Sequence, residues 1–259
     1  MGAALSSVHA LWWREIIRFV RQRSRLVGAF AQPLVFWLLL GGGFSASFRP
    51  PGMPADVSAL QYFYPGIIAL VLLFTAIFAT IAVVEDRKAG FLQGVLVAPI
   101  PRASIVLGQA LGGTTLAVVQ GALFLVLAPL AGIPLSFAAV LEVTLVLVAV
   151  AFALTSLGLV IAWQMESTQG FHAIMNLILM PIWILSGAFF PAAGAPGWLG
   201  WVMRLNPLTY GMAALRRALY LATPAAAGQL PSFAPSLAIT LAFCVVAFGG
   251  ATAVARRSS

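Results

Sequence analysis

The residues best suited to chemistry in this chain are few, and their spacing argues against catalysis. The chain has 6 acidic residues and 2 histidines, and these are scattered rather than grouped at the spacing of metal ligands. Lys88 is the sole lysine, and it follows Glu85, Asp86 and Arg87 instead of the glycine-rich turn of a phosphate-binding loop. No Gly-x-Ser-x-Gly nucleophile motif is present either. We therefore expect no enzyme activity, no metal and no cofactor in this chain.

The composition is that of an integral membrane protein. Hydrophobic residues make up 62% of the 259 residues and charged residues only 8%, whereas soluble domains carry about 25% charged residues. Apolar segments long enough to cross a bilayer core, which takes about 20 helical residues, cover residues 27–48, 62–84, 104–130, 138–163, 171–190 and 236–255. Backbone groups in lipid must bond within their own segment, so we predict an all-α fold with six transmembrane helices. The first segment exceeds a signal-peptide core in length, and we expect it to be retained rather than cleaved near Ala46.

Basic residues predict the orientation of these segments, because cytoplasmic loops are enriched in arginine and lysine. With both termini in the cytoplasm, the inner set is Arg14, Arg18, Arg21, Arg23, Arg25, Arg87, Lys88, Arg102, Arg256 and Arg257, and the outer set is Arg49, Arg204, Arg216 and Arg217. The net charge of +8 is spread over segment ends and forms no single basic face, so it favours anionic lipid over nucleic acid as the counter-charge. The preference for alanine and arginine is typical of a GC-rich bacterium, which places the chain in a bacterial cytoplasmic (inner) membrane.

Residues 1–26, before the first span, carry the pattern of an amphipathic interface helix. Trp12 falls on an apolar face, while Arg14, Arg18 and Arg21 recur at helical spacing on the opposite face. We predict a single helix over residues 5–25. It is either a positively charged anchor for the first span or a surface helix that also touches a cytoplasmic partner.

Residues 85–103 form the one substantial charged loop on the cytoplasmic side. Between Gly90 and Pro99, apolar residues recur four positions apart and so share one face of a short helix. Such a helix either lies flat on lipid or fills a groove on a partner. The side chains expected to fill that groove are Phe91, Leu92, Val95 and Leu96, and the charges expected at its rim are Arg87, Lys88 and Arg102.

Residues 187–222, on the outer side, are too apolar for a free loop and too rich in turn formers for a simple span. They predict either short re-entrant helices packed on protein or a plain extracellular cap. Glu142 is the acidic residue nearest the body of a span, where it can snorkel, make a polar contact or hold a proton. The candidates for an outer vestibule are Glu142, Asn206, Tyr210 and Arg216.

Aromatic and amide side chains in the first, second and fifth spans are candidates for a translocation path. Such residues also serve ordinary helix packing, and the sequence pattern does not separate the two uses. If they line a path, they suit an apolar or amphipathic substrate. The candidates are Gln32, Phe36, Trp37, Phe74, Phe78, Asn176, Trp183 and Phe189.

Short motifs follow one another along nearly the whole chain: Tyr64-Pro65-Gly66, Glu85-Asp86-Arg87-Lys88-Ala89-Gly90, Pro99-Ile100-Pro101-Arg102, Gly187-Ala188-Phe189-Phe190-Pro191 and Asn206-Pro207-Leu208-Thr209-Tyr210. This series resembles the permease subunits of type-2 ABC exporters, the group that includes daunorubicin-resistance and nodulation-factor export permeases. The resemblance implies that residues 27–259 form a six-span transmembrane domain, with a coupling helix in residues 85–103 and re-entrant helices in residues 187–222. It also implies a permease dimer in which each copy receives a separate subunit that binds ATP and Mg²⁺.

The function expected from the sequence is therefore the membrane-spanning half of an ATP-driven exporter. An amphipathic drug, lipid or glycolipid is the expected substrate, and a polysaccharide is the alternative. The competing class is a gradient-driven secondary transporter or channel, which usually needs ionisable or unwound elements at mid-membrane. This chain has almost none, and dependence of transport on ATP would separate the two classes.

Overall fold

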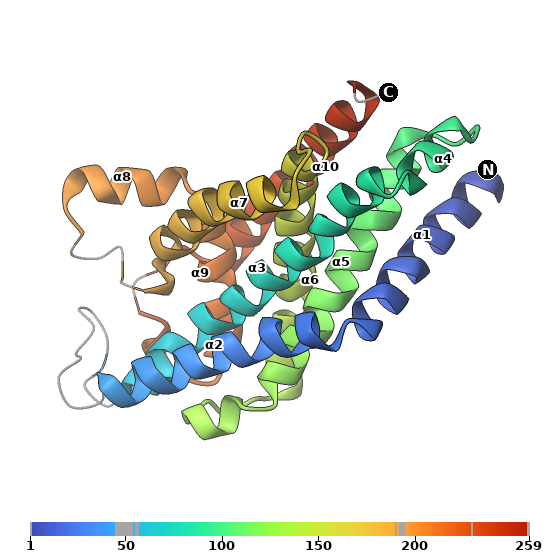
Figure 1. The fold of residues 1–259 in the computed structure, drawn as a ribbon. Coiled ribbons are helices and arrows are strands. Elements are labelled where there is room, and N and C mark those ends of the chain that lie inside the picture. The colour runs from blue at the N-terminus through green and yellow to red at the C-terminus, as the bar shows by residue number, and fades with distance from the viewer. Residues whose placement is uncertain are drawn as a thin grey trace.

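The chain folds into a bundle of helices (Figure 1). The computed structural model describes residues 2–44, 54, 57–189, 191, 195–228 and 230–257, and for residues 2, 3 and 23–26 the backbone alone. Residues 45–48, Arg49 and Phe190, named in the expectations above, lie outside the described residues. The described elements are, in chain order, α1 (Gly2–Arg21), α2 (Arg23–Gly43), α3 (Ala59–Lys88), α4 (Phe91–Val97), α5 (Arg102–Leu125), η1 (Ala128–Ala131), α6 (Phe137–Ala162), α7 (Thr168–Trp183), η2 (Ile184–Ala188), α8 (Gly197–Leu205), α9 (Pro207–Leu219), η3 (Pro224–Ala227) and α10 (Phe233–Arg257).

Among the described residues, 5 helices are long and apolar enough to cross a membrane: α3, α5, α6, α10, and α7 continued through η2. They confirm an all-α membrane protein. The apolar part of α2, Val27–Gly43, is shorter than these spans, and the expected first span extends beyond it to residues that are not described. Helix α5 ends at Leu125 instead of residue 130, because Pro129 has no N–H with which to extend an α-helix.

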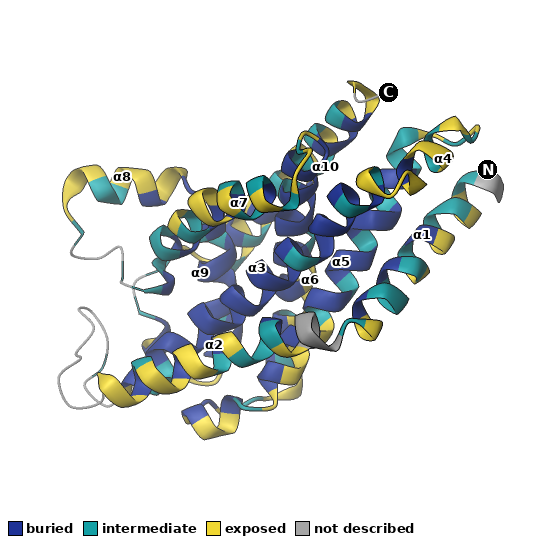
Figure 2. Cartoon of the chain, viewed as in Figure 1, coloured by how far each residue is buried: buried dark blue, intermediate teal, exposed yellow. Residues whose placement is uncertain are grey.

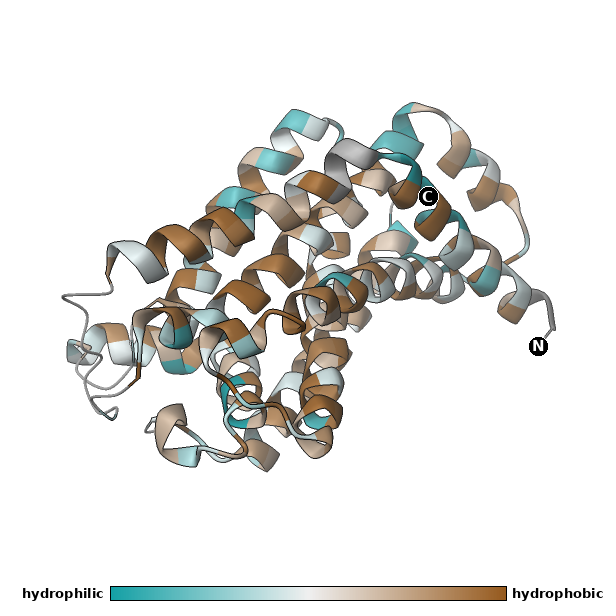
Figure 3. Ribbon diagram, turned by 90° about the horizontal axis from the view of Figure 1, so that it is seen from below, coloured by the Kyte–Doolittle hydropathy of each residue, from teal (hydrophilic) through white to brown (hydrophobic). Residues whose placement is uncertain are grey.

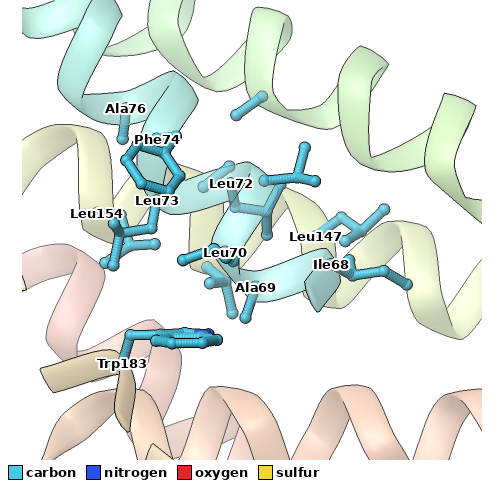
Figure 4. Packing of buried hydrophobic residues seen from close by; sticks show 14 of the residues in the cluster. Ile68, Ala69, Leu70, Leu72, Leu73, Phe74, Ala76, Leu147, Leu154 and Trp183 are labelled. Atoms are coloured by element: carbon cyan, nitrogen blue, oxygen red, sulfur yellow. The ribbon is translucent and has the colours of Figure 1, made fainter. Parts of the chain in front are cut away.

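Helix α3 is the centre of the bundle, in contact with α2, α5, α6 and α7. Its apolar stretch is 94% buried, and Figure 2 shows it dark blue along most of its length. Figure 4 shows Leu72 of α3 among side chains that include Leu147 and Leu154 of α6 and Trp183 of α7. A Cβ at Gly66 would lie 2.7 Å from a backbone oxygen of η2. Hydrophobic residues cover most of the helical ribbons (Figure 3), so close packing of this kind has to supply the association energy between helices in lipid.

Helix α1 packs on α5, and two glycines of α5 set the distance between them. A Cβ at Gly108 would lie 2.8 Å from the Cβ of Leu11, and one at Gly112 would lie 2.7 Å from the Cβ of Glu15. Glycines four residues apart form a flat face that allows such close approach. The helix ends at Arg21, where the next residue adopts φ −94° and ψ 75°. The expectation of one helix through residue 25 is therefore wrong at its C-terminal end.

The two termini and α4 lie at the same end of the bundle (Figure 1). At the other end, α7 passes into the π-helical turn η2, and Gly187 leaves it with φ 86°, a conformation that favours glycine. Helices α8 and α9 follow, and α9 packs against α6 and α10. Residues 187–222 thus contain short helices as expected, with 190 and 192–194 outside the described part, and their insertion into a leaflet stays a prediction.

Candidate functional site

The expected short helix between α3 and α5 is present as α4 and is fixed at both ends. Gly90 precedes it with φ 75°, a backbone conformation that other residues adopt only with strain. At its C-terminal end, Nη1 of Arg102 donates to the carbonyl oxygen of Leu96 at 3.0 Å. Ala98 is extended, as the residue before a proline usually is. The helix is therefore held in one position on the bundle.

The exposed residues of α4 differ from those expected. Leu92 is only 3% exposed and packs inside this chain, so it is not available to a partner, and Val95 and Leu96 are half-buried. Phe91 is 40% exposed and Val97 is 85% exposed. The four-residue spacing identified an apolar face correctly, but that face contacts the bundle itself. Val97, which lies outside that pattern, was missed.

Two of the three expected rim charges bind within the chain. Arg87 donates from Nη2 to the carbonyl oxygen of Trp163 at 2.5 Å and from Nη1 to that of Met165 at 3.2 Å. These carbonyls follow the C-terminus of α6, where backbone oxygens lack helical partners and cations are favourable. Since Arg102 is bound to α4, both arginines are positioning residues rather than free charges. Lys88 is exposed.

The basic face of α1 binds an acidic pair at the end of α3. Arg14 donates to both carboxylate oxygens of Asp86 at 2.6 Å each, and Arg18 donates to Asp86 at 2.8 Å and to Glu85 at 2.5 Å. The hydrogen bond with Asp86 raises the pKa of Arg14. The Arg14 guanidinium also lies 3.8 Å from the centroid of the Phe91 ring. The ion pairs thus connect α1 to α3, and the cation–π contact of Arg14 connects α1 to the first residue of α4.

The remaining contacts of α1 bind it to α5. Trp12 donates from Nε1 to Oγ1 of Thr115 at 3.0 Å. Glu15 is 5% exposed, and burial, opposed first by the charge of Arg18, raises the pKa of its carboxyl to about 7. Arg21 is exposed. Because polar and apolar contacts both attach α1, we expect it to move together with α3 and α5.

A groove of about 470 Å³ separates α1 from α4. Its walls are small or apolar: Ser7, Ala10 and Leu11 come from α1, and Gly94 and Val95 from α4. A Cβ added at Gly94 would have no neighbouring heavy atom within 4 Å, so the groove is open at this position. The structure therefore offers a hollow at the α4 end, lined in part by the exposed Phe91, that an apolar side chain can fill.

A second cleft, of about 490 Å³, lies between α2, α3 and α7. It brings together Gln32, Phe74, Phe78 and Asn176, which the sequence placed on a translocation path, with His172. The rings of Phe74 and Phe78 are stacked with centroids 6.4 Å apart, and His172 meets Phe78 edge-on at 6.3 Å. Sequence reasoning missed His172 as a residue of this cleft. The cleft combines an aromatic wall with exposed amides.

The other expected path residues do not join this cleft. Trp37 is 3% exposed, and its Nε1 donates to the carbonyl oxygen of Leu60 at 2.9 Å. Trp183 is likewise buried and donates to a carbonyl of α3 at 2.8 Å, and Phe189 packs edge-on against it at 6.0 Å. These three side chains hold helices together. Phe36 is 37% exposed on α2.

Three of the four expected vestibule residues are structural. Asn206 donates from Nδ2 to the carbonyl oxygen of Ile182 at 2.7 Å. Arg216 is 3% exposed and donates to carbonyls of α3 and η2 at 3.4 and 3.3 Å. Tyr210 donates to the carbonyl oxygen of Arg204 at 3.0 Å. These bonds join η2, α8 and α9 to the bundle, whereas Glu142 lines a cavity.

The amino-acid sequence of this chain is similar to a known protein family and to several named proteins. Residues 6–220 match the family described as ABC-2 type transporter. The chain is 28% identical over 215 residues to the putative transport permease ycf38 of Porphyra purpurea, which covers 82% of this chain and 73% of that protein. It is 28% identical over 218 residues to Nodulation protein J of Rhizobium leguminosarum bv. trifolii, covering 83% and 81%. It is 24% identical over 229 residues to the daunorubicin resistance ABC transporter permease protein DrrB1 of Streptomyces coeruleorubidus, covering 85% and 77%.

Proposed function

The chain belongs to the ABC-2 type transporter family, and on this basis we propose that it is the membrane subunit of an ATP-driven exporter. Hydrolysis takes place on a separate ATP-binding subunit in the cytoplasm. The observation that carries this proposal is the fixed helix α4, which lines an apolar groove with Phe91, Gly94 and Val95 and presents the exposed side chain of Val97. Apolar side chains that gather into a patch mark an interaction site, and the helix that carries the exposed Phe91 and Val97 also lines the apolar groove.

The bonds around α4 support a route by which a partner could move the spans. Arg14 connects the ring of Phe91 to Asp86 of α3, and Arg87 connects the end of α3 to the turn before α7. A displacement of α4 therefore acts on α1, α3 and α7 together. ATP can drive this movement only if the ATP-bound form of the partner subunit prefers one arrangement of α4. A shift in the ratio of the two arrangements from 1:99 to 99:1 needs a difference in binding free energy of about 5.5 kcal/mol.

The cleft between α2, α3 and α7 is the proposed translocation path. Its aromatic wall suits apolar parts of a substrate, and the exposed amides of Gln32 and Asn176 suit polar parts. The outer faces of α2 and α7 carry exposed apolar residues such as Leu39, 67% exposed, and Leu177, 75% exposed, which a second copy of the chain would cover. An amphipathic drug, lipid or glycolipid fits this cleft better than a polysaccharide.

The experiment that tests the coupling site is purification of the tagged protein from its native membrane, followed by an ATPase assay. Val97→Asp should abolish co-purification of the ATPase, because a carboxylate buried without a partner costs about 3–5 kcal/mol, a loss of more than about a hundredfold in affinity. Val97→Leu is the matched control and should retain it. Leu92→Asp is a poorer variant, since Leu92 is buried in this chain and its change would disrupt α4.

Each alternative outcome has a distinct meaning. If Val97→Asp binds the ATPase as well as Val97→Leu does, α4 is not the docking surface. If no ATPase accompanies even the unaltered protein, and transport proceeds without ATP, the gradient-driven class replaces the exporter.

A further inference from the structure

A third cavity lies at the end of the bundle opposite α4, between α6, α9, η3 and α10. Its volume is about 320 Å³. Glu142 enters it from the second turn of α6, Arg217 from the last turn of α9, and Ser232 and Phe233 from the start of α10. The elements around it are not those of the cleft between α2, α3 and α7, so the proposed path does not use this cavity.

Opposite charges face this cavity without pairing with each other. Arg217 donates from Nε to the carbonyl oxygen of Pro231 at 2.7 Å and from Nη2 to that of Leu230, which leaves Nη1 without an acceptor among the described residues. Within the described part of the chain, the Glu142 carboxylate forms no hydrogen bond and no ion pair within 4.0 Å. A half-buried carboxylate and a guanidinium held in place on one cavity are suited to a ligand that carries both charges.

We propose that this cavity binds the headgroup of a zwitterionic phospholipid that has a primary ammonium next to its phosphate. The ammonium lies against the Glu142 carboxylate, and the phosphate lies against Nη1 of Arg217 and the Ser232 hydroxyl. Leu221, which is 39% exposed, and Phe233 form the apolar part of the wall.

The surroundings of the cavity favour a lipid over a soluble zwitterion. Glu142 and Phe233 lie at the ends of two spans, the depth at which headgroups meet acyl chains. Leu141, Leu145 and Val148 are 57%, 49% and 44% exposed and share one face of α6, where acyl chains can lie.

Charge and hydrogen bonding select the headgroup. An anionic headgroup without an amine would be repelled by Glu142. A trimethylated amine keeps the positive charge, but it has no N–H to donate to the carboxylate.

The test is native mass spectrometry of the purified full-length protein with added dioleoyl phosphatidylethanolamine or dioleoyl phosphatidylglycerol. The unaltered protein should retain the ethanolamine lipid about tenfold better, as expected for one charge-assisted hydrogen bond. Glu142→Gln keeps the shape of the side chain and should remove this preference. Glu166→Gln, the same change at an exposed position in the turn before α7, is the matched control and should retain it.

Three results would overturn the proposal. Equal retention of the two lipids by the unaltered protein would exclude recognition of the amine. An undiminished preference in Glu142→Gln would exclude the carboxylate. Displacement of the lipid by an equal concentration of O-phosphoethanolamine, which has the headgroup without acyl chains, would assign the cavity to a soluble ligand instead.

Discussion

Most arginines that the sequence offered as functional charges bind backbone oxygens of this chain. Arg87 and Arg102 each donate to carbonyls at or just beyond a helix C-terminus, and the buried Arg216 donates to carbonyls of α3 and η2. Helix C-termini leave such oxygens unpaired, and a guanidinium has five donors with which to satisfy them. A basic residue near a membrane helix therefore locates a helix end, and only its contacts show whether it is free to bind a partner.

Glu15 is the residue whose protonation should change stability near neutral pH. Burial raises the pKa of its carboxyl from 4.5 to about 7, and the opposing charges of Arg18 and of Arg14, which lies 3.3 Å away, offset burial only in part. The folded state then holds the proton more tightly than the unfolded state, so stability falls as pH rises from about 4.5 to about 7 and levels off above. Glu15→Gln removes this slope and should unfold at a higher temperature than the unaltered protein at pH 8.

The measurement is the unfolding temperature in detergent, followed by tryptophan fluorescence between pH 5 and pH 8. A gain of 1 kcal/mol corresponds to about 2–4 °C for a chain of this size. The two proteins should converge towards pH 5, where Glu15 is protonated. Parallel curves over the whole range would show that Glu15 does not titrate there.

The contact between α1 and α5 is a place where a single added methyl group should have a large effect. Gly112→Ala places a Cβ 2.7 Å from the Cβ of Glu15, too close unless α1 shifts. We expect a loss of about 1–3 kcal/mol, the usual cost of overpacking, together with weaker coupling to the ATPase. Gly250→Ala in α10, whose Cβ would sit at an ordinary 3.5 Å from Val160, is the control and should be neutral or stabilising by up to about 1 kcal/mol. Equal unfolding temperatures for the two variants would contradict the close packing.

The helices could be predicted from the sequence largely because hydrophobic length and proline positions have local causes. The short helix expected between Gly90 and Pro99 is present as α4, with its end one residue earlier than residue 98 because Ala98 is extended. The inward direction of Leu92 was not predictable, because period alone does not say which neighbour an apolar face meets. The acidic pair Glu85 and Asp86 was likewise not assigned to the arginines of α1. Their contacts join positions 67 to 72 residues apart, which no local pattern encodes.

The two ends of the bundle differ chemically, and this difference gives the molecule a direction. One end has α4, both termini and the ion pairs of α1 with α3. The opposite end has η1, η3 and the cavity that contains Glu142 and Arg217. The proposed exporter requires the α4 end to face the cytoplasm, because ATP is available there and the docking surface must meet its partner. Orientation in the membrane is therefore a property that the whole mechanism depends on.

Cysteine labelling in spheroplasts of a bacterial host tests that orientation. The native Cys244 is buried and is replaced in a Cys244→Ala background. Val97→Cys and Leu130→Cys then place single thiols at positions 85% and 73% exposed, at opposite ends of the bundle. A membrane-impermeant maleimide should label Leu130→Cys in intact spheroplasts and Val97→Cys only after lysis, as the excess of basic residues at the α4 end predicts. The reverse pattern would place α4 outside the cell, where no cytoplasmic ATPase can reach it, and the coupling proposal would fail whatever the substrate.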